Sequence, residues 1–391
     1  MIDVNQQALL ELLKASLFGA EPVFPEGVDW DAVLQEAKDQ TVVALAAPAV
    51  PEEEAVKWQV PAAQNKMRFF QVLDEQTKLV QLFHDAGIPM VILKGFAAAI
   101  YYPVPLQRTM GDVDFIIPQN RFDDARRLMD ENGYIFTHKT DRHHGYIKNN
   151  QSLELHYRYS EENWDFEHLI AEGLTRASSA EIYGKDFSVL PVEINGLVLL
   201  DHIRSHLYGG LGIRQIVDWM LFVHAYLDDA AWAEQFASLA REPGLETLAL
   251  TVTKMCKLWF GLPDEITWCD DADEETAEQL MELVFGFGNF GIKRKDDGQP
   301  MDTISMDVSR YGLFRYLQMT GESTWKAYQK HHFLKPFAWM YQIFRFAKSG
   351  ITAVFRGEKD KVDTSQAKEK YALYQKLGIN FYQNSSSEKI E

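Results

Sequence analysis

The stretch VILKGFAAAIYYPVPLQRTMGDVDF, residues Val91–Phe115, decides the fold of this chain. Its apolar start predicts a strand that ends at Lys94, and the small residues that follow predict a short helix. A second strand then carries Asp112 and Asp114, with Val113 between them. Because side chains alternate between the two faces of a strand, both carboxylates point to one side and Val113 points to the other.

A third carboxylate is expected near this pair. In the later segment SLELHY, Glu154 alternates with two leucines and His156 follows two residues on, so both should leave their strand on its polar face. Neighbouring carboxylates repel one another unless a cation lies between them, and Mg2+ or Mn2+ is the usual ion. If the two strands are neighbours, Asp112, Asp114 and Glu154 converge as catalytic residues and metal ligands. Glu154 would hold a second ion or act as a general base.

The turn at Lys94 and Gly95 is a candidate phosphate-binding site. Gly95 lets the backbone come close to a phosphate, the first amides of the following helix can donate to it, and Lys94 adds a positive charge. Arg108, in the Pro-rich loop before the aspartates, is a second candidate phosphate ligand. An ordinary surface arginine is an equally good interpretation of Arg108.

The pattern of predicted elements divides the chain into four parts. Alternating strand and helix signals in 62–195 predict a small mixed sheet with helices against it, so the expected fold class is α+β. Helical patterns predict an N-terminal lobe in 1–61 and a helical bundle in 196–323. The last part, 324–391, is expected to be a basic, aromatic helical segment with a frayed polar tail. Further strands are expected near YIFT, GYIK, SLELHY and FSVLPVEI.

Composition limits the classes of partner. The chain has 391 residues and a formal net charge of -18, which disfavours broad binding to DNA or RNA. Its two cysteines, Cys256 and Cys269, are too few for a disulfide framework and fit a reducing compartment. The N-terminal sequence lacks the pattern of a signal peptide, and no apolar stretch approaches the roughly 20 residues of a spanning helix. We therefore expect a soluble, cytoplasmic protein.

The segment 325–357 reverses the overall sign of the charge, because it contains lysines and arginines and no acidic residue. One interpretation is a helix that packs on the bundle through its aromatic residues and keeps its lysines in water. The other is a surface that makes peripheral contact with anionic lipid or a phosphorylated substrate. The sequence leaves both open.

The order of these motifs resembles the nucleotidyltransferase superfamily, which has a DNA polymerase beta-like palm. The motifs LKG, helix, Tyr-x-x-Pro, Arg108, Gly-Asp-x-Asp and Leu-x-Leu-His follow one another. This order resembles, more narrowly, the bacterial group of uncharacterised nucleotidyltransferases in which LKG precedes DhD. The resemblance extends from Phe69 to about Tyr226, because a His-x-x-x-His and Arg-x-x-x-Asp helix pair follows. It implies a minimal palm fold, a divalent metal and a nucleoside triphosphate, such as ATP, as donor.

One departure from the superfamily pattern concerns the first strand-to-helix turn. The usual Gly-Ser is replaced by Lys94, Gly95 and Phe96, so no serine hydroxyl is present to bind the triphosphate. Either Lys94 substitutes for that hydroxyl or the donor is bound in a different way.

Other polar residues have competing interpretations. His202 and His206 lie one helical turn apart, but a zinc site normally needs three protein ligands, so a hydrogen-bonded pair at a domain seam is favoured. Arg214 either contacts the base or the acceptor, held by the aspartate four residues later, or forms an intrahelical ion pair with it. His143 and His144 fall on a predicted turn, where exposed histidines are common, and no role is assigned to them.

The leading functional hypothesis is an enzyme that transfers a nucleotidyl group from a nucleoside triphosphate to a hydroxyl of a small molecule, sugar or protein. The carboxylates Asp112, Asp114 and Glu154, together with Lys94 and Gly95, motivate it. The alternative is a noncatalytic nucleotide-binding or scaffold protein with the same fold. A kinase-like phosphotransferase is a third possibility, which would add one phosphate to the acceptor in place of a whole nucleotide.

Overall fold

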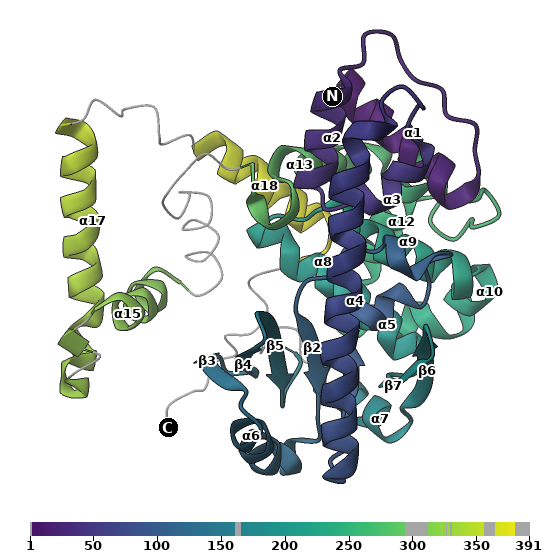
Figure 1. Ribbon diagram of the computed structural model, residues 1–391. Helices are drawn as coiled ribbons and strands as arrows, with labels where there is room; N and C mark the ends of the chain where they lie inside the picture. Colours follow the sequence, from purple (N-terminus) through teal and green to yellow (C-terminus); the bar gives the residue numbers. More distant parts are fainter. Residues whose placement is uncertain are drawn as a thin grey trace. The chain divides into compact units, whose positions relative to one another are not determined.

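The computed structural model divides into two compact units, residues 1–294 (unit 1) and 295–391 (unit 2), and each is described by itself. Unit 1 holds a mixed sheet surrounded by helices (Figure 1). The residues that the structure describes are 2–160, 166–293, 312–325, 327–328, 331–355 and 364–379.

The sheet has seven strands in the order β3-β4-β5-β2-β1-β7-β6. β2 runs antiparallel to β1 and parallel to β5, so a strand pair distant in sequence lies at the centre. A mixed sheet with helices packed on it confirms the predicted α+β class. The strands are β1 Val91–Leu93, β2 Val113–Ile116, β3 Ile135–Lys139, β4 His143–Lys148, β5 Gln151–His156, β6 Ser178–Ile182 and β7 Lys185–Val189.

One long helix, α4, spans 31 residues and passes across the sheet (Figure 1). It continues through Pro61, although the sequence pattern placed a boundary between 61 and 62. The helix continues because Trp58 and Ala62 on either side are buried against the fold, and tertiary packing of this kind outweighs the lost backbone hydrogen bond. The helices up to this point are α1 Val4–Phe18, α2 Trp30–Asp39, α3 Val43–Ala46 and α4 Ala55–Asp85.

The core lies on the face of the sheet that is covered by α4 and by α6 (Phe122–Glu131). Val113 and Phe115 of β2 are buried there, and the ring of Phe115 meets that of Phe83 on α4 edge to face at 5.4 Å. Leu153 of β5 joins the same cluster. The alternation predicted for β2 and β5 therefore holds, and it leaves the polar residues of both strands on the opposite face.

The hairpin β6–β7 differs from the predicted strands. Its turn residues Tyr183 and Gly184 both have positive φ, which matches the twist of a tight hairpin. β6 was not predicted because four of its five residues are at least partly exposed and it lacks an apolar alternation. The segment PVEI, predicted as strand, instead begins helix α8 after Pro191, whose ring suits the start of a helix.

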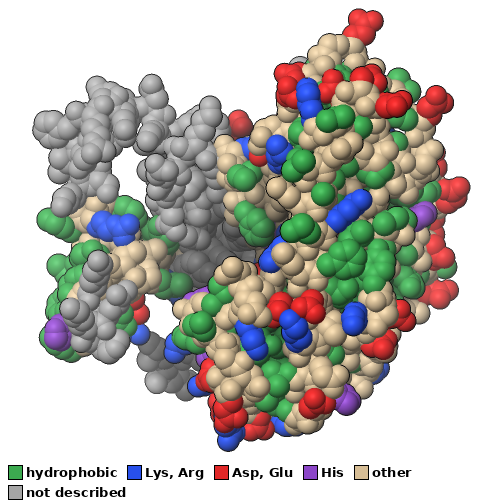
Figure 2. Space-filling view, viewed as in Figure 1, with side chains coloured by type: hydrophobic (Ala, Val, Ile, Leu, Met, Phe, Trp, Pro, Cys, Tyr) green, Lys and Arg blue, Asp and Glu red, His purple; other side chains and the backbone are tan. Residues whose placement is uncertain are grey.

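The remaining helices of unit 1 follow α6. Among them, α12 packs against both α9 and α13, and α8 packs against α9. They are α5 Gly95–Ala99, α7 Glu167–Thr175, α8 Val192–Gly209, α9 Ile213–Tyr226, α10 Asp229–Ala231, α11 Ala237–Arg241, α12 Glu246–Phe260 and α13 Glu274–Phe287, with a π-helical turn at Trp232–Phe236. Acidic side chains are scattered over the face of unit 1 in Figure 2, as the net charge of -18 requires.

In unit 2, α15 (Leu313–Thr324) packs on α17 (Ala338–Phe355), and α18 (Thr364–Lys376) follows. Stacked rings of Trp325 and Tyr341 help to join the first two helices. Throughout the part of the chain that the structure describes, every helix is too short or too polar to cross a membrane. The two interpretations of 325–357, and the division of the chain into four parts, stay predictions.

The packing of α4 on β2 yields a test of stability. Phe83 is fully buried against Phe115, whereas Met67 on the same helix is 64% exposed. We expect Phe83→Ala to lower the free energy of unfolding by about 3–5 kcal/mol, because it leaves a cavity in the core. Met67→Ala should change it by less than about 0.5 kcal/mol. Urea denaturation measures both, and equal losses would contradict this account of the core.

Candidate functional site

The two predicted acidic strands are neighbours in the sheet. β2 and β5 pair in parallel with Asp114 directly opposite Glu154. Asp112 immediately precedes β2, and β1 pairs with β2 so that Leu93 lies opposite Asp114, which brings Lys94 to the same end. The convergence of carboxylates from distant parts of the chain is therefore present, as the strand pattern predicted.

These residues line a cavity of about 190 Å³ on the polar face of the sheet. Helix α8 and the region that begins α9 contribute the other wall. The lining residues are Lys94, Gly95, Arg108, Gly111, Asp112, Asp114, Glu154, His202, Ser205, His206, Arg214 and Phe290.

Asp114 is the most strongly held carboxylate of the cavity. Its Oδ1 accepts hydrogen bonds from Lys94 Nζ at 3.0 Å and from His156 Nε2 at 3.1 Å. Burial raises the pKa of Asp114, but the positive charge of Lys94 and the hydrogen bond from His156 lower it by more. The pKa of Asp114 therefore lies well below its usual range. Burial lowers the pKa of His156, but its hydrogen bonds to Asp114 and Glu154 outweigh burial and raise this pKa. Asp114 is therefore ionised and fixed in direction.

Asp112 behaves differently. The negative charge of Asp114, followed by partial loss of solvent, raises the pKa of Asp112 to about 6. Its side chain is exposed at the cavity, whereas Asp114 is buried. Near neutral pH the cavity therefore contains an ionised carboxylate whose charge is poorly compensated, the condition that favours binding of a cation.

The turn that carries Lys94 has an uncommon backbone. Lys94 has φ 50° and ψ -135°, a region that residues with a side chain rarely occupy, and Gly95 follows with φ 30°. The turn places the Lys94 ammonium against Asp114. Burial lowers the pKa of Lys94, but the attraction of Asp114, Glu154 and Asp112 outweighs burial and raises this pKa. Strain of this kind persists where the surrounding structure holds it, often at functional sites.

Arg108 is not a surface arginine. Its guanidinium is buried and donates two hydrogen bonds to Asp218 on α9, from Nε at 2.8 Å and from Nη2 at 2.7 Å. The hydroxyl of Tyr102 donates to the same carboxylate at 2.8 Å. One of the two interpretations of Arg214 was an intrahelical ion pair with Asp218. Asp218 instead forms this longer-range bidentate pair, which ties the loop before β2 to α9.

Arg214 has more free hydrogen-bonding capacity. Its Nη1 donates to the carbonyl of Thr109 at 3.2 Å, while among the described residues its Nε has no hydrogen-bond partner despite being buried. The guanidinium carbon lies 6.0 Å from the centre of the Phe290 ring. Burial, and then the charge of Arg108, lower the pKa of Arg214. Arg214 is thus a cation inside the cavity with a donor to spare.

His202 and His206 lie in the cavity wall, where sequence reasoning did not place them. Their Nε2 atoms are 2.9 Å apart, so they form the hydrogen-bonded pair that the seam interpretation expected. Burial lowers the pKa of His206 to about 4, with Arg214 contributing, and lowers that of His202 as well. Both rings are therefore neutral at pH 7. Their spacing on one helix face was the available signal, but the sequence did not show that this face meets β2.

His143 lies on β4 and not on a turn, because that strand begins at His143. It is buried, and its Nε2 lies 3.5 Å from Glu154 Oε1 and 3.4 Å from Nε2 of His138 on β3. Burial lowers the pKa of His143 to about 4. His144 alternates to the other face, where its ring meets that of Phe122 at 4.9 Å. The sequence did not place His143 beside Glu154 because its strand was predicted to start later.

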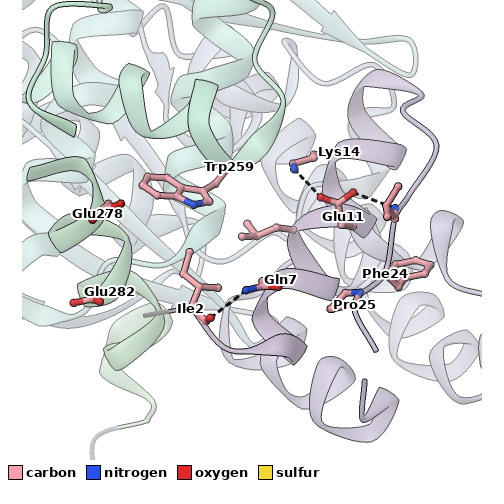
Figure 3. A pocket seen from close by; sticks show the side chains of 11 residues that line it. Ile2, Gln7, Glu11, Lys14, Phe24, Pro25, Trp259, Glu278 and Glu282 are labelled. Carbon is pink, nitrogen blue, oxygen red and sulfur yellow. Dashed lines mark hydrogen bonds and ion pairs between the residues drawn. The ribbon is translucent and has the colours of Figure 1, made fainter. Parts of the chain in front are cut away.

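A second and larger cavity, of about 550 Å³, opens between the N-terminal helices and α12 and α13. Trp259, Glu278 and Glu282 line one side, and Glu11 faces them from α1, where it binds Lys14 at 2.6 Å (Figure 3). The lining of this cavity includes none of the residues predicted from the sequence to bind metal or phosphate. Volume alone therefore does not select the chemical site.

The residues of the smaller cavity fit a divalent cation. Asp114, Glu154 and His156 each place one possible ligand atom within 4.8 Å of the other two, and Asp112 is next to Asp114 in sequence. Carboxylate oxygens are the ligands that Mg2+ and Mn2+ prefer. The raised pKa of Asp112 shows that like charges are held close, which a bound cation would relieve.

The chain as a whole belongs to a described family. Residues 26–261, more than half of its length, match the family model described as uncharacterised nucleotidyltransferase, and the chain is a member of that family. The match includes β1, β2, β5 and the cavity residues up to Arg214. The class of this protein is therefore nucleotidyltransferase.

Comparison with solved structures finds weak similarity to ANT(2")-Ia. A crystal structure of that protein in complex with adenylyl-2"-tobramycin is 17% identical, with 38% of this chain and 88% of that chain covered and a TM-score of 0.30. A solution structure of the same antibiotic-resistance factor is 15% identical, with 44% and 96% covered and a TM-score of 0.32. Similarity at this level carries no argument about this chain. None of the curated proteins matches it.

The pair of Arg108 and Asp218 predicts a large effect on stability. Asp218→Asn should lower the free energy of unfolding by about 3–5 kcal/mol, because it leaves the buried Arg108 without its counter-charge. The control is Asp186→Asn, at an exposed position of β7, which should change it by less than about 0.5 kcal/mol. Urea denaturation compares the two. An effect of Asp218→Asn as small as that of the control would show that the pair does not hold the loop.

Proposed function

We propose that this protein is a metal-dependent nucleotidyltransferase that moves a nucleotidyl group from a nucleoside triphosphate to a hydroxyl of a small molecule, sugar or protein. The acceptor oxygen forms a bond to the α-phosphorus, the bond from that phosphorus to the bridging oxygen breaks, and pyrophosphate leaves. The observation that supports this most is the convergence of Asp112, Asp114 and Glu154 in a cavity that also contains Lys94 and Arg214.

The carboxylates of Asp112, Asp114 and Glu154 would hold Mg2+ or Mn2+. The bound ion supplies charge neutralisation of the phosphate oxygens as the leaving pyrophosphate gains negative charge. Lys94 and His156 fix Asp114 by bonding to its Oδ1 and leave Oδ2 for a ligand. A carboxylate that is already ionised and oriented costs little reorganisation when it binds.

Two cations of the cavity, Lys94 and Arg214, suit the triphosphate. Lys94 lies at the turn where the superfamily's serine is absent, and Gly95 beside it has no side chain to obstruct a phosphate. Arg214 lines the same cavity, where its guanidinium would bind a phosphate oxygen. Arg108 is held by Asp218, so we assign it the positioning of the loop that leads to Asp112.

The proton of the acceptor hydroxyl needs a base. Glu154 is the candidate, because its side chain is 23% exposed, more than that of Asp114. Its charged partners among the described residues are histidines, and no lysine or arginine pairs with it there. His156 Nε2 lies 3.4 Å from Glu154 Oε2 and links it to Asp114. The same histidine can thus keep both carboxylates in place while one accepts the proton.

The charge of the chain restricts the acceptor. A net charge of -18 disfavours DNA and RNA as acceptors, which leaves small molecules, sugars and proteins. We place the reaction in the cytoplasm, where nucleoside triphosphates are available. The competing function is a noncatalytic nucleotide-binding or scaffold protein, which would bind the triphosphate without releasing pyrophosphate.

Nucleotide binding and transfer can be tested with one variant and one control. Isothermal calorimetry with Mg2+ and ATP, CTP, GTP or UTP should show binding to the wild type that Asp114→Asn weakens roughly tenfold or more. Asp123→Asn, at a side chain 89% exposed on α6, should leave it unchanged. Absence of heat with all four triphosphates, in Mg2+ and in Mn2+, would refute the proposal.

Transfer itself is followed by mass spectrometry of cell metabolites and proteins incubated with the enzyme. A whole nucleotide should be added to the acceptor, and Asp114→Asn should abolish the addition. A gain of one phosphate would identify a kinase, and binding without any mass gain would favour the noncatalytic alternative.

The pKa of Asp112 predicts how metal affinity depends on pH. Because this pKa is raised to about 6, a proton competes with the metal below that pH, and Mg2+ affinity should fall roughly tenfold per pH unit there. Asp114→Asn removes the largest cause of the raised pKa and should move the Asp112 pKa back toward its ordinary value. Carboxyl NMR titration measures it. An unchanged Asp112 pKa in Asp114→Asn would show that the two carboxylates do not interact.

A further inference from the structure

Two histidines and a glutamate form a compact cluster on the sheet beside the candidate site. His138 on β3, His143 on β4 and Glu154 on β5 each place a ligand atom within 4.8 Å of the other two. We propose that these three side chains form a binding site for a divalent transition-metal ion, with Zn2+ as the ion that fits best. The site is separate from the pair of aspartates and does not depend on nucleotidyl transfer.

Two of the three spacings between the ligand atoms match a tetrahedral ion, and the third is within 4.8 Å. His143 Nε2 lies 3.4 Å from His138 Nε2 and 3.5 Å from Glu154 Oε1. With metal-to-ligand distances of about 2.0–2.1 Å, neighbouring ligands of a tetrahedral zinc are roughly 3.3–3.4 Å apart. Two imidazoles and one carboxylate are a common zinc ligand set, which leaves a fourth position for water or a substrate oxygen. Imidazole ligands also favour zinc over magnesium.

Both imidazoles are held so that Nε2 faces the cluster. Nδ1 of His138 lies 3.0 Å from the hydroxyl of Thr137, and Nδ1 of His143 lies 3.2 Å from that of Thr140. If each Nδ1 carries the proton and donates it to the threonine oxygen, each Nε2 presents a lone pair. Hydrogen bonds of this kind are the usual support of metal-binding histidines, because they fix the tautomer and the direction of the ring.

The backbone of the sheet brings the three residues together. Gly145 of β4 pairs with Glu154 on one side and with His138 on the other, so these positions form one row across three strands. A register shift between Phe136 and His138 re-aims the edge strand. The His138 ring then lies over Gly145, where a Cβ would overlap it. A side chain at position 145 would thus displace the His138 ring from its place near its partners.

The proposed ion would also fix Glu154. Its Oε1 faces His143, while its Oε2 lies 3.4 Å from His156 Nε2 on the side of Asp114. Binding of zinc at Oε1 would set the direction of the carboxylate that we assign as base or metal ligand in transfer. The second metal site and the candidate active site would therefore share one side chain.

Zinc binding to the whole chain, stripped of metal with a chelator, tests the proposal. Competition with a chromophoric chelator, in excess Mg2+, should show one tightly bound Zn2+ per chain. His138→Gln and His143→Gln should each weaken this binding by about 100-fold or more. Gly145→Ala should weaken it as well, because it displaces the His138 ring. Co2+ bound in place of Zn2+ should give the visible absorption of a tetrahedral site.

The matched control is His144→Gln, next to His143 in sequence but on the opposite face of β4, which should bind zinc as the wild type does. Asp112→Asn should also retain zinc binding, since Asp112 is outside the cluster, so failure of nucleotidyl transfer and failure of this proposal are distinguishable. Circular dichroism verifies that each variant is folded. Wild type without a stoichiometric zinc, or a folded His138→Gln with unchanged zinc affinity, would overturn the proposal.

Discussion

The structure around the cavity depends on how Asp114 is held. A buried carboxylate next to two others is electrostatically unfavourable, and here Lys94 and His156 both donate to its Oδ1. Lys94 can reach it because the chain turns there through a strained backbone conformation. The compensation is local and incomplete, since it stabilises the charge of Asp114 and leaves that of Asp112 opposed. The residual repulsion is the condition under which the proposed cation would bind favourably.

The sheet separates the repelling carboxylates of the cavity from the hydrophobic core. On β2 and β5, alternate residues such as Phe115 and Leu153 are buried with α4, while Asp114 and Glu154 point the other way. A shift of one residue in the pairing would put carboxylates into the hydrophobic interior. The same burial that stabilises the fold therefore fixes the register of the site, and the register extends through Gly145 to His138 at the edge strand.

Local pattern accounts for the parts of the fold and site that the sequence predicted. The positions of Asp114 and Glu154 follow from a period of two, which is visible in a short segment. Contacts between distant segments were not visible. The sequence could not show that Asp218 binds Arg108, because an arginine four residues away in the same helix was an equally good partner. It also could not show that the His202 face of α8 turns toward β2, or that β4 begins as early as His143.

If the proposed function holds, the charge of the cavity would let so acidic a chain accommodate a triphosphate. Screening limits the reach of exposed charges to about 8–10 Å at physiological salt, so the net charge of -18, spread over the surface, matters less than the groups inside the cavity. There Lys94 and Arg214 lie with Asp112, Asp114 and Glu154, whereas the charge of Arg108 is neutralised by Asp218, and the proposed divalent ion would make the balance positive. The acidic surface would instead repel polyanions that are too large to enter. An arrangement of this kind would favour a compact phosphate ligand over a nucleic acid, because the positive charge lies inside the cavity and the negative charge lies on the surface.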